Sequence, residues 1–193
     1  MKPLAREDLL SLENYAVRRS EFRARAITHK KARTVHVGEH LTLIFEDRLS
    51  IQYQVQEMLR IERIFEADAI QDELDAYNPL IPGGEDLKAT LLLEFPDVEQ
   101  RRSELVRLRG IEHATELTIE GQPPVVAIAD EDMPRSNDVK TSAVHFLRFT
   151  LTAAQISAWK AGAAVRLAST LAALPVATVL SAEQQRSLAA DFD

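Results

Sequence analysis

The chain contains no cysteine among its 193 residues. This absence excludes disulfide bonds, iron–sulfur clusters or zinc held by the chain's own thiolates, and cysteine nucleophiles. Any chemistry must therefore use histidine, carboxylate, lysine or hydroxyl side chains. The amino-terminal residues carry charges where a signal peptide would have an apolar run, and no window is apolar enough to span a membrane. We expect a cytoplasmic protein with no membrane segment.

The familiar catalytic and nucleotide-binding motifs are also missing. There is no glycine-rich dinucleotide loop, no P-loop, no His-Glu-x-x-His zinc motif and no Gly-x-Ser-x-Gly elbow. Lys140, Thr141 and Ser142 resemble the end of a phosphate loop, but no glycines precede them. They could position an anion or supply a nucleophile, although a solvated loop that caps the next strand is the simpler interpretation.

The charge is acidic overall but unevenly distributed. A net charge of −7 argues against nucleic acid as a partner. The segment Arg18 to Arg33 is nevertheless strongly basic, with Glu21 as its only acidic residue. We interpret it as a solvated helix face whose arginines pair with the acidic remainder, with anion binding as the alternative. The acidic surface and the alanine-rich tail permit a homodimer without requiring one.

Hydrophobic spacing predicts a mixed arrangement of helices and strands. A first helix is expected over residues 4–31, a central helix after Asp47, and a short helix capped by Asp68. A further helix is expected within 95–112, and two more follow Thr152 and Ser181, each of which opens a capping-box pattern. Strands are predicted within 40–48, 88–95, 114–120, 123–130, 142–151, 164–169 and 175–180.

Short connections between the strands of residues 114–151 favour an antiparallel meander. We therefore predict an α+β fold in which an antiparallel sheet packs against a central helix and several further helices. Residues 1–193 would form a single domain, with 163–193 as a small carboxy-terminal appendage.

The central helix should bury most of its circumference, as its apolar positions Ile51, Val55 and Leu59 indicate. Three polar residues fall within the predicted buried arc: Gln54, Glu57 and Glu62. A buried carboxylate is costly unless it is paired, hydrogen-bonded, protonated or bound to a metal. Each of these residues therefore needs a partner from another part of the chain.

Metal binding is one way to meet that need. Glu57 and Glu62 could join His29, with His36 and His40 as further candidates, because carboxylates and imidazoles suit iron, manganese or zinc. The two glutamates lie about 140° apart around a helix, so they cannot simply chelate one ion from one face. The structural interpretation, which we favour, pairs both with Arg19, Arg23 or Arg25 of the first helix.

A second candidate site combines an acidic cluster with a histidine. Asp130, Glu131 and Asp132 close one predicted strand, and His145 lies on the next strand among apolar residues. Adjacent carboxylates can serve as a base or as cation ligands. Acidic residues are also common in turns, and a lone histidine on an apolar face is more often a core residue. We favour that structural role while retaining Glu131 and His145 as metal candidates.

Long stretches of the chain resemble a bacterial family known only as domain of unknown function 3501. The stretches include HKKARTVHVGEHLTLIFEDRLSIQYQVQEMLRIERIFE and AIADEDMPRSNDVKTSAVHFLRFTLTAAQISAWKAGA, and the resemblance extends from Leu9 to about Leu167. It implies a bacterial protein whose relatives are encoded near rubrerythrin-like and iron–sulfur redox proteins. Such relatives carry a His-Pro segment where this chain reads TLAALPVATVL, without histidine. If that histidine were a ligand, this chain would lack it.

Together these observations predict an accessory protein or interaction partner in a redox or oxidative-stress system. Its expected partners are redox proteins such as rubrerythrin-like or iron–sulfur proteins. The alternative is a metal-binding protein or metal-dependent enzyme that uses buried Glu and His ligands. The residues indicate no substrate or reaction, so enzymatic activity stays an open alternative.

Overall fold

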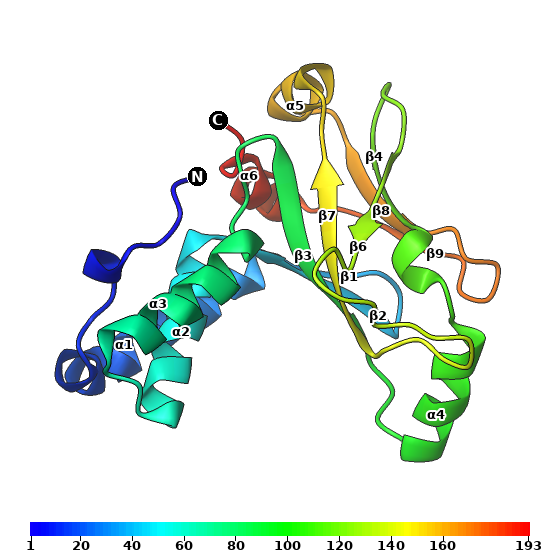
Figure 1. The fold of residues 1–193 in the computed structure, drawn as a ribbon. Helices are drawn as coiled ribbons and strands as arrows, with labels where there is room; N and C mark the ends of the chain where they lie inside the picture. The colour runs from blue at the N-terminus through cyan, green and yellow to red at the C-terminus, as the bar shows by residue number, and fades with distance from the viewer.

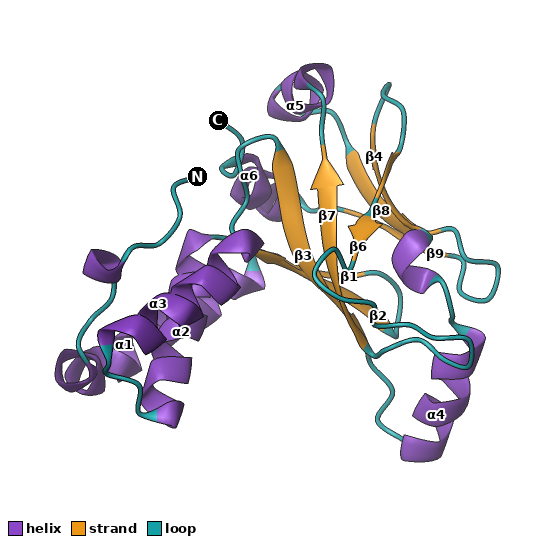
Figure 2. Ribbon diagram, viewed as in Figure 1, coloured by secondary structure: helices purple, strands orange, loops and turns teal.

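Two separate apolar cores organise the chain in the computed structural model, which describes all residues from 1 to 193. The larger core lies between two antiparallel sheets, and the smaller core lies inside an amino-terminal layer of helices. Figure 1 shows this helical layer standing to one side of the sheets. The predicted α+β class is confirmed (Figure 2).

The helical layer contains α1 (Leu12–Lys31), α2 (Arg48–Glu62) and α3 (Ala67–Tyr77), with short 3-10 helices at Arg6–Asp8 and Asn78–Leu80. Ser11 caps α1, so the chain before it is not part of the long helix predicted from residue 4. Asp47 accepts a hydrogen bond from the Ser50 amide at 2.8 Å, and the Ser50 hydroxyl accepts one from the Asp47 amide. This reciprocal cap fixes the start of α2.

The helix α2 is central only to the smaller core. Ile51, Val55 and Leu59 are buried there, as predicted. Gln56 is also fully buried, and its side-chain amide both accepts from and donates to the backbone of Leu10. Glu62 is exposed, so its predicted burial is wrong. The helix ends just beyond it because Arg63 adopts a left-handed conformation with φ of 57°.

The first sheet has the strand order β1, β2, β3, β7, β6. Its strands are β1 (Thr34–His36), β2 (Leu41–Glu46), β3 (Asp86–Leu93), β7 (Val144–Thr150) and β6 (Ile128–Ala129). In β3, Leu87 and every second residue after it are buried, whereas Lys88 and Thr90 on the other face are only half-buried. One face of this sheet therefore forms the larger core, and the other turns toward the helical layer.

The second sheet has the strand order β5, β4, β8, β9. Its strands are β5 (Val125–Val126), β4 (Thr115–Ile119), β8 (Val165–Ser169) and β9 (Val176–Val179). The predicted single meander is wrong because residues 123–130 divide between the sheets, with β5 pairing with β4 and β6 pairing with β7. Ala127, between the two short strands, is buried in the core. A strand that changes sheets in this way closes one corner of the sandwich.

The remaining helices are α4 (Val98–Arg107), α5 (Ala153–Lys160) and α6 (Ala182–Ala189), with a 3-10 turn at Ile111–His113. Thr152 and Ser181 form the capping boxes that the sequence predicts for α5 and α6. No helix combines the length and the apolar character that a membrane crossing requires.

Residues 163–193 are an integral part of the sandwich, not the predicted appendage. Strand β8 lies between β4 and β9, and Leu188 and Phe192 belong to the larger core. The ring of Phe192 contacts Trp159 edge-on, with centroids 5.4 Å apart. The sequence did not predict this role because the segment is rich in alanine and contains few large apolar residues, whose spacing would indicate a buried face.

We expect Phe192→Ala to lower the free energy of unfolding by about 3 kcal/mol, because it leaves a cavity in the core. Urea denaturation followed by circular dichroism measures this loss. The control is Val179→Ala, at a β9 position that is 62% exposed. Equal stability of the two variants would restore the interpretation of this segment as an appendage.

Candidate functional site

A groove of about 640 Å³ lies between the helical layer and the outer face of the first sheet. Gln54 of α2 and Tyr77 of α3 line it on the helical side, and Lys88 and Arg148 line it on the sheet. Its volume falls within the range typical of small-molecule sites, which often lie where two packed units meet. It is therefore the candidate site for binding.

The floor of the groove carries a row of charges that the strand register sets side by side. Glu46 of β2 lies opposite Lys88 of β3, and Lys88 lies opposite Arg148 of β7. All three project from the same sheet face, because directly paired residues share a face. The sequence did not reveal this row, since the three residues are separated by dozens of positions and only strand pairing joins them.

Each charge in the row is held by a different partner. The Glu46 carboxylate accepts hydrogen bonds from the hydroxyls of Ser50 at 2.6 Å and Thr90 at 3.1 Å. The Lys88 ammonium donates to the carbonyl of Pro79 on the helical side. Lys88 therefore links the sheet to the helical layer across the groove.

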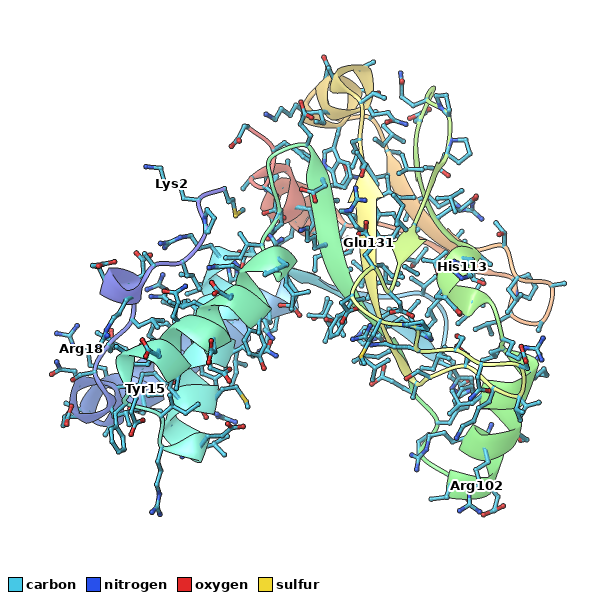
Figure 3. All side chains as sticks on the ribbon, viewed as in Figure 1. Lys2, Tyr15, Arg18, Arg102, His113 and Glu131 are labelled. Atoms are coloured by element: carbon cyan, nitrogen blue, oxygen red, sulfur yellow. The ribbon has the colours of Figure 1, made fainter.

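Arg148 is paired with Glu131, one of the predicted metal candidates. Its guanidinium donates to both carboxylate oxygens, at 2.8 and 2.7 Å. The Arg148 guanidinium lowers the pKa of Glu131, which is half exposed at the rim of the groove. Figure 3 shows Glu131 beside the sheets. Glu131 is thus part of the groove wall and keeps its negative charge at neutral pH.

His145, the other candidate of that pair, belongs to a different and fully buried network. Its Nδ1 lies 2.6 Å from a carboxylate oxygen of Asp130, and its Nε2 lies 2.8 Å from the hydroxyl of Thr141. Asp130, and not Glu131, is therefore the carboxylate that contacts His145. The backbone of Asp130 adopts a left-handed φ of 49°, which turns this side chain toward the histidine.

The same network continues to Glu112, which no sequence pattern singled out. Glu112 is buried and accepts hydrogen bonds from Ser136 and from Thr141. Burial by itself would raise the pKa of Glu112, but the hydrogen bond from Ser136 and the nearby histidines lower it on balance. Ionised Glu112 therefore anchors the loop that carries Ser136 and Thr141. An aspartate, a histidine and a hydroxyl are aligned here as in nucleophilic triads, yet Thr141 is only 1% exposed.

Glu57, the other metal candidate in the central helix, is bound by three side chains. It accepts hydrogen bonds from Tyr15 at 2.6 Å, from Arg19 at 2.8 Å and from Arg60 at 3.0 Å. The Arg19 guanidinium is the main cause of a lowered pKa of about 2 for Glu57. Burial of Tyr15 and its bond to Glu57 raise the pKa of the phenol. The expected pairing of Glu57 with Arg19 is confirmed.

His29 lies far from Glu57, at the opposite end of α2. Its Nε2 is 2.5 Å from a carboxylate oxygen of Asp47, ten residues or about 15 Å of helix before Glu57. His36 contacts Thr42, and His40 contacts the backbone of Glu94. The fold therefore does not bring these histidines to Glu57 or to the exposed Glu62. No group of three or more histidine and carboxylate side chains is arranged to hold a metal ion.

Arg33 and Asp191 form a fully buried ion pair, which no local sequence pattern indicated. The Arg33 side chain is 1% exposed and donates to the backbone carbonyls of Phe45, Glu46 and Ser187. It also contacts Asp191 at 2.5 Å. Burial raises the pKa of Asp191 to about 6 despite this contact, and its second carboxylate oxygen has no hydrogen-bond partner.

The fold and the groove thus define an α+β protein with a candidate binding site between a helical layer and a β-sandwich. The chain belongs to the family described as Protein of unknown function (DUF3501), whose model matches residues 3–192. It is 49% identical to a Burkholderia pseudomallei K96243 protein of known crystal structure, described as a novel protein of unknown function. That similarity covers 100% of each chain with a TM-score of 0.94. No curated protein matches.

Removing the charge of Glu57 should destabilise the protein in a pH-dependent way. Its pKa falls from an ordinary value of 4.5 to about 2 on folding, so its ionised form stabilises the fold above pH 4.5. We expect Glu57→Gln to cost about 2 kcal/mol at pH 7, less than the full pKa shift implies because both arginines are partly exposed. In urea denaturation, the difference from wild type should shrink as the pH falls from 4.5 toward 2.

Asp191→Asn should show the opposite dependence. The pKa of Asp191 rises from 3.8 to about 6 on folding, so the folded state binds the extra proton and loses stability as the pH rises between these values. The stability of wild type relative to Asp191→Asn should therefore be greater at pH 4 than at pH 7. Urea denaturation of both proteins at the two pH values checks this, and an unchanged difference would contradict the assigned pKa.

Proposed function

We propose that the protein is an accessory binding protein in a redox or oxidative-stress system and acts by binding a partner. The observation that carries this proposal is the groove between the two cores, where charged and aromatic side chains from separate parts of the chain converge. The resemblance to proteins encoded beside rubrerythrin-like and iron–sulfur proteins supports the choice of system.

The state of the polar residues outside the groove supports binding over catalysis. Glu57 already accepts from three side chains, and both ring nitrogens of His145 lie within hydrogen-bonding distance of protein oxygens. Removing a member of such a network should lower the free energy of unfolding, by about 2 kcal/mol for the partly exposed Glu57 and by roughly 3 to 5 kcal/mol for the fully buried His145, which is the expected signature of a structural role. The groove residues, by contrast, lie at a surface that a partner can reach.

Metal binding, the alternative predicted from the sequence, would have to displace existing contacts. A metal ion at Glu57 would compete with two arginines, and one at His145 would compete with Asp130 and Thr141. Iron, manganese or zinc at these residues is therefore the second candidate function. It is distinguished by elemental analysis of protein purified without chelators.

Partner binding can be tested with a purified rubrerythrin-like protein and a purified iron–sulfur protein of the source organism. We expect at least one of them to bind in biolayer interferometry. Ala76→Trp places a large side chain at an exposed position of the groove wall and should weaken binding about tenfold or more. The control Ala172→Trp, at an exposed position between β8 and β9, should bind like wild type.

Two results would overturn the accessory role in favour of other functions. The first is the absence of binding to either redox protein, and the second is equal binding by Ala76→Trp and wild type. Iron, manganese or zinc near one ion per chain, lost in Glu57→Gln or in His145→Gln, would instead establish the metal-binding alternative.

A further inference from the structure

An ion pair that the strand register favours is absent from the floor of the groove. Glu46 and Lys88 lie directly opposite each other on neighbouring antiparallel strands and project from one face. Opposite charges in this position normally attract each other across the strands. Here, however, Glu46 turns to the hydroxyls of Ser50 and Thr90, and Lys88 turns to the carbonyl of Pro79.

The negative charge of Glu46 has a single cationic partner, and that partner lies beyond hydrogen-bonding distance. Its carboxylate is 6% exposed, and the nearest cation is the ammonium of Lys30, 4.0 Å away. The two hydroxyls that hold it are neutral donors, so they orient the carboxylate without neutralising it. A buried carboxylate held in this way would gain from a cationic group entering the groove.

The positive end of the row lies on the next two strands. Lys88 and Arg148 are direct neighbours across β3 and β7, so their Cα atoms are about 5 Å apart. Two nitrogens of the Arg148 guanidinium donate to the Glu131 carboxylate. The Lys88 ammonium lies 3.9 Å from the carboxylate of Asp86, which is beyond hydrogen-bonding distance. The sheet therefore presents one negative and two positive groups in sequence across three strands.

We propose that this row binds a small zwitterion, namely a free amino acid or a short peptide with both ends uncapped. The ligand's ammonium group would contact Glu46, and its carboxylate would contact Lys88 and the edge of Arg148. Tyr77 and Phe146, which line opposite sides of the groove, would enclose its side chain. This assignment rests on the proposed binding function, because it names a ligand for the same groove.

Ligands with one sign of charge fit the row less well. A simple anion at Lys88 would lie beside the Glu46 carboxylate, and a simple cation at Glu46 would lie beside the Lys88 ammonium, so each would meet a like charge. A zwitterion satisfies both ends at once and replaces the missing cross-strand ion pair. The separation of the charges in the ligand then selects between a single amino acid and a dipeptide.

The test is a thermal-shift screen of the whole protein with the twenty amino acids and a set of dipeptides, followed by isothermal titration calorimetry. We expect at least one of these ligands to raise Tm and to bind with one site per chain. The N-acetylated form and the carboxy-terminal amide of that ligand should each bind about tenfold or more weakly, because each lacks one charge.

Variants assign the two charges of the ligand to the groove. Glu46→Gln keeps a side chain that can accept hydrogen bonds from Ser50 and Thr90. This variant should lower the affinity for the parent ligand and leave the affinity for its N-acetylated form unchanged. Lys88→Met should also lower the affinity for the parent ligand, but it should leave the affinity for the carboxy-terminal amide unchanged. The controls are Glu99→Gln and Lys140→Met, two exposed positions that do not line the groove. If Glu46→Gln fails to fold, Lys88→Met and Arg148→Gln still test the carboxylate end.

The outcomes separate this inference from the accessory role. Absence of any bound amino acid or dipeptide, or equal affinity for the blocked forms, overturns the zwitterion assignment. If a redox partner still binds wild type and not Ala76→Trp, the accessory role stands without it. If neither class of ligand binds, both proposals fail.

Discussion

The buried guanidinium of Arg33 joins the three parts of the molecule. It follows α1, donates to carbonyls at the end of β2, and contacts α6 through Ser187 and Asp191. A charge that is 1% exposed must be fully hydrogen-bonded, since an unpaired one would cost several kcal/mol. Its Nε also lies 3.8 Å from the Asp47 carboxylate at the start of α2, so the contacts of Arg33 require the helical layer, the first sheet and the carboxy-terminal segment together. Arg33 therefore couples the helical layer to the sandwich.

The groove is a consequence of that arrangement. The two cores are separate, so the outer face of the first sheet is left partly uncovered between them. Polar residues occupy this face because every second position of β3 and β7 turns away from the larger core. In the resulting row from Glu46 to Arg148, Glu46 and Lys88 lie opposite each other without forming an ion pair, and Arg148 pairs with Glu131. Elsewhere, around Glu57 and His145, charged groups are matched internally and hold the fold.

Local patterns predicted the elements well and the candidate site poorly. The capping boxes at Thr152 and Ser181 are visible because both partners lie within four residues. The pairing of Glu57 with Arg19 was also accessible, because a carboxylate in the buried arc of a helix needs a partner and the basic first helix supplies arginines. Glu62 was misplaced because helical periodicity does not show where a helix ends, and Glu62 is the last residue of α2 before the left-handed turn at Arg63.

The sequence by itself determined the α+β class, most strand and helix positions, and the family, because these depend on the spacing of apolar residues and on continuous stretches of chain. Only the tertiary structure decided which strands pair, and hence that residues 123–130 divide between two sheets. It also decided the contacts of Arg33 with Asp191 and of Glu46 with its neighbours in the groove. Such contacts join residues that are remote along the chain, and their energy depends on burial and register, which no local pattern specifies.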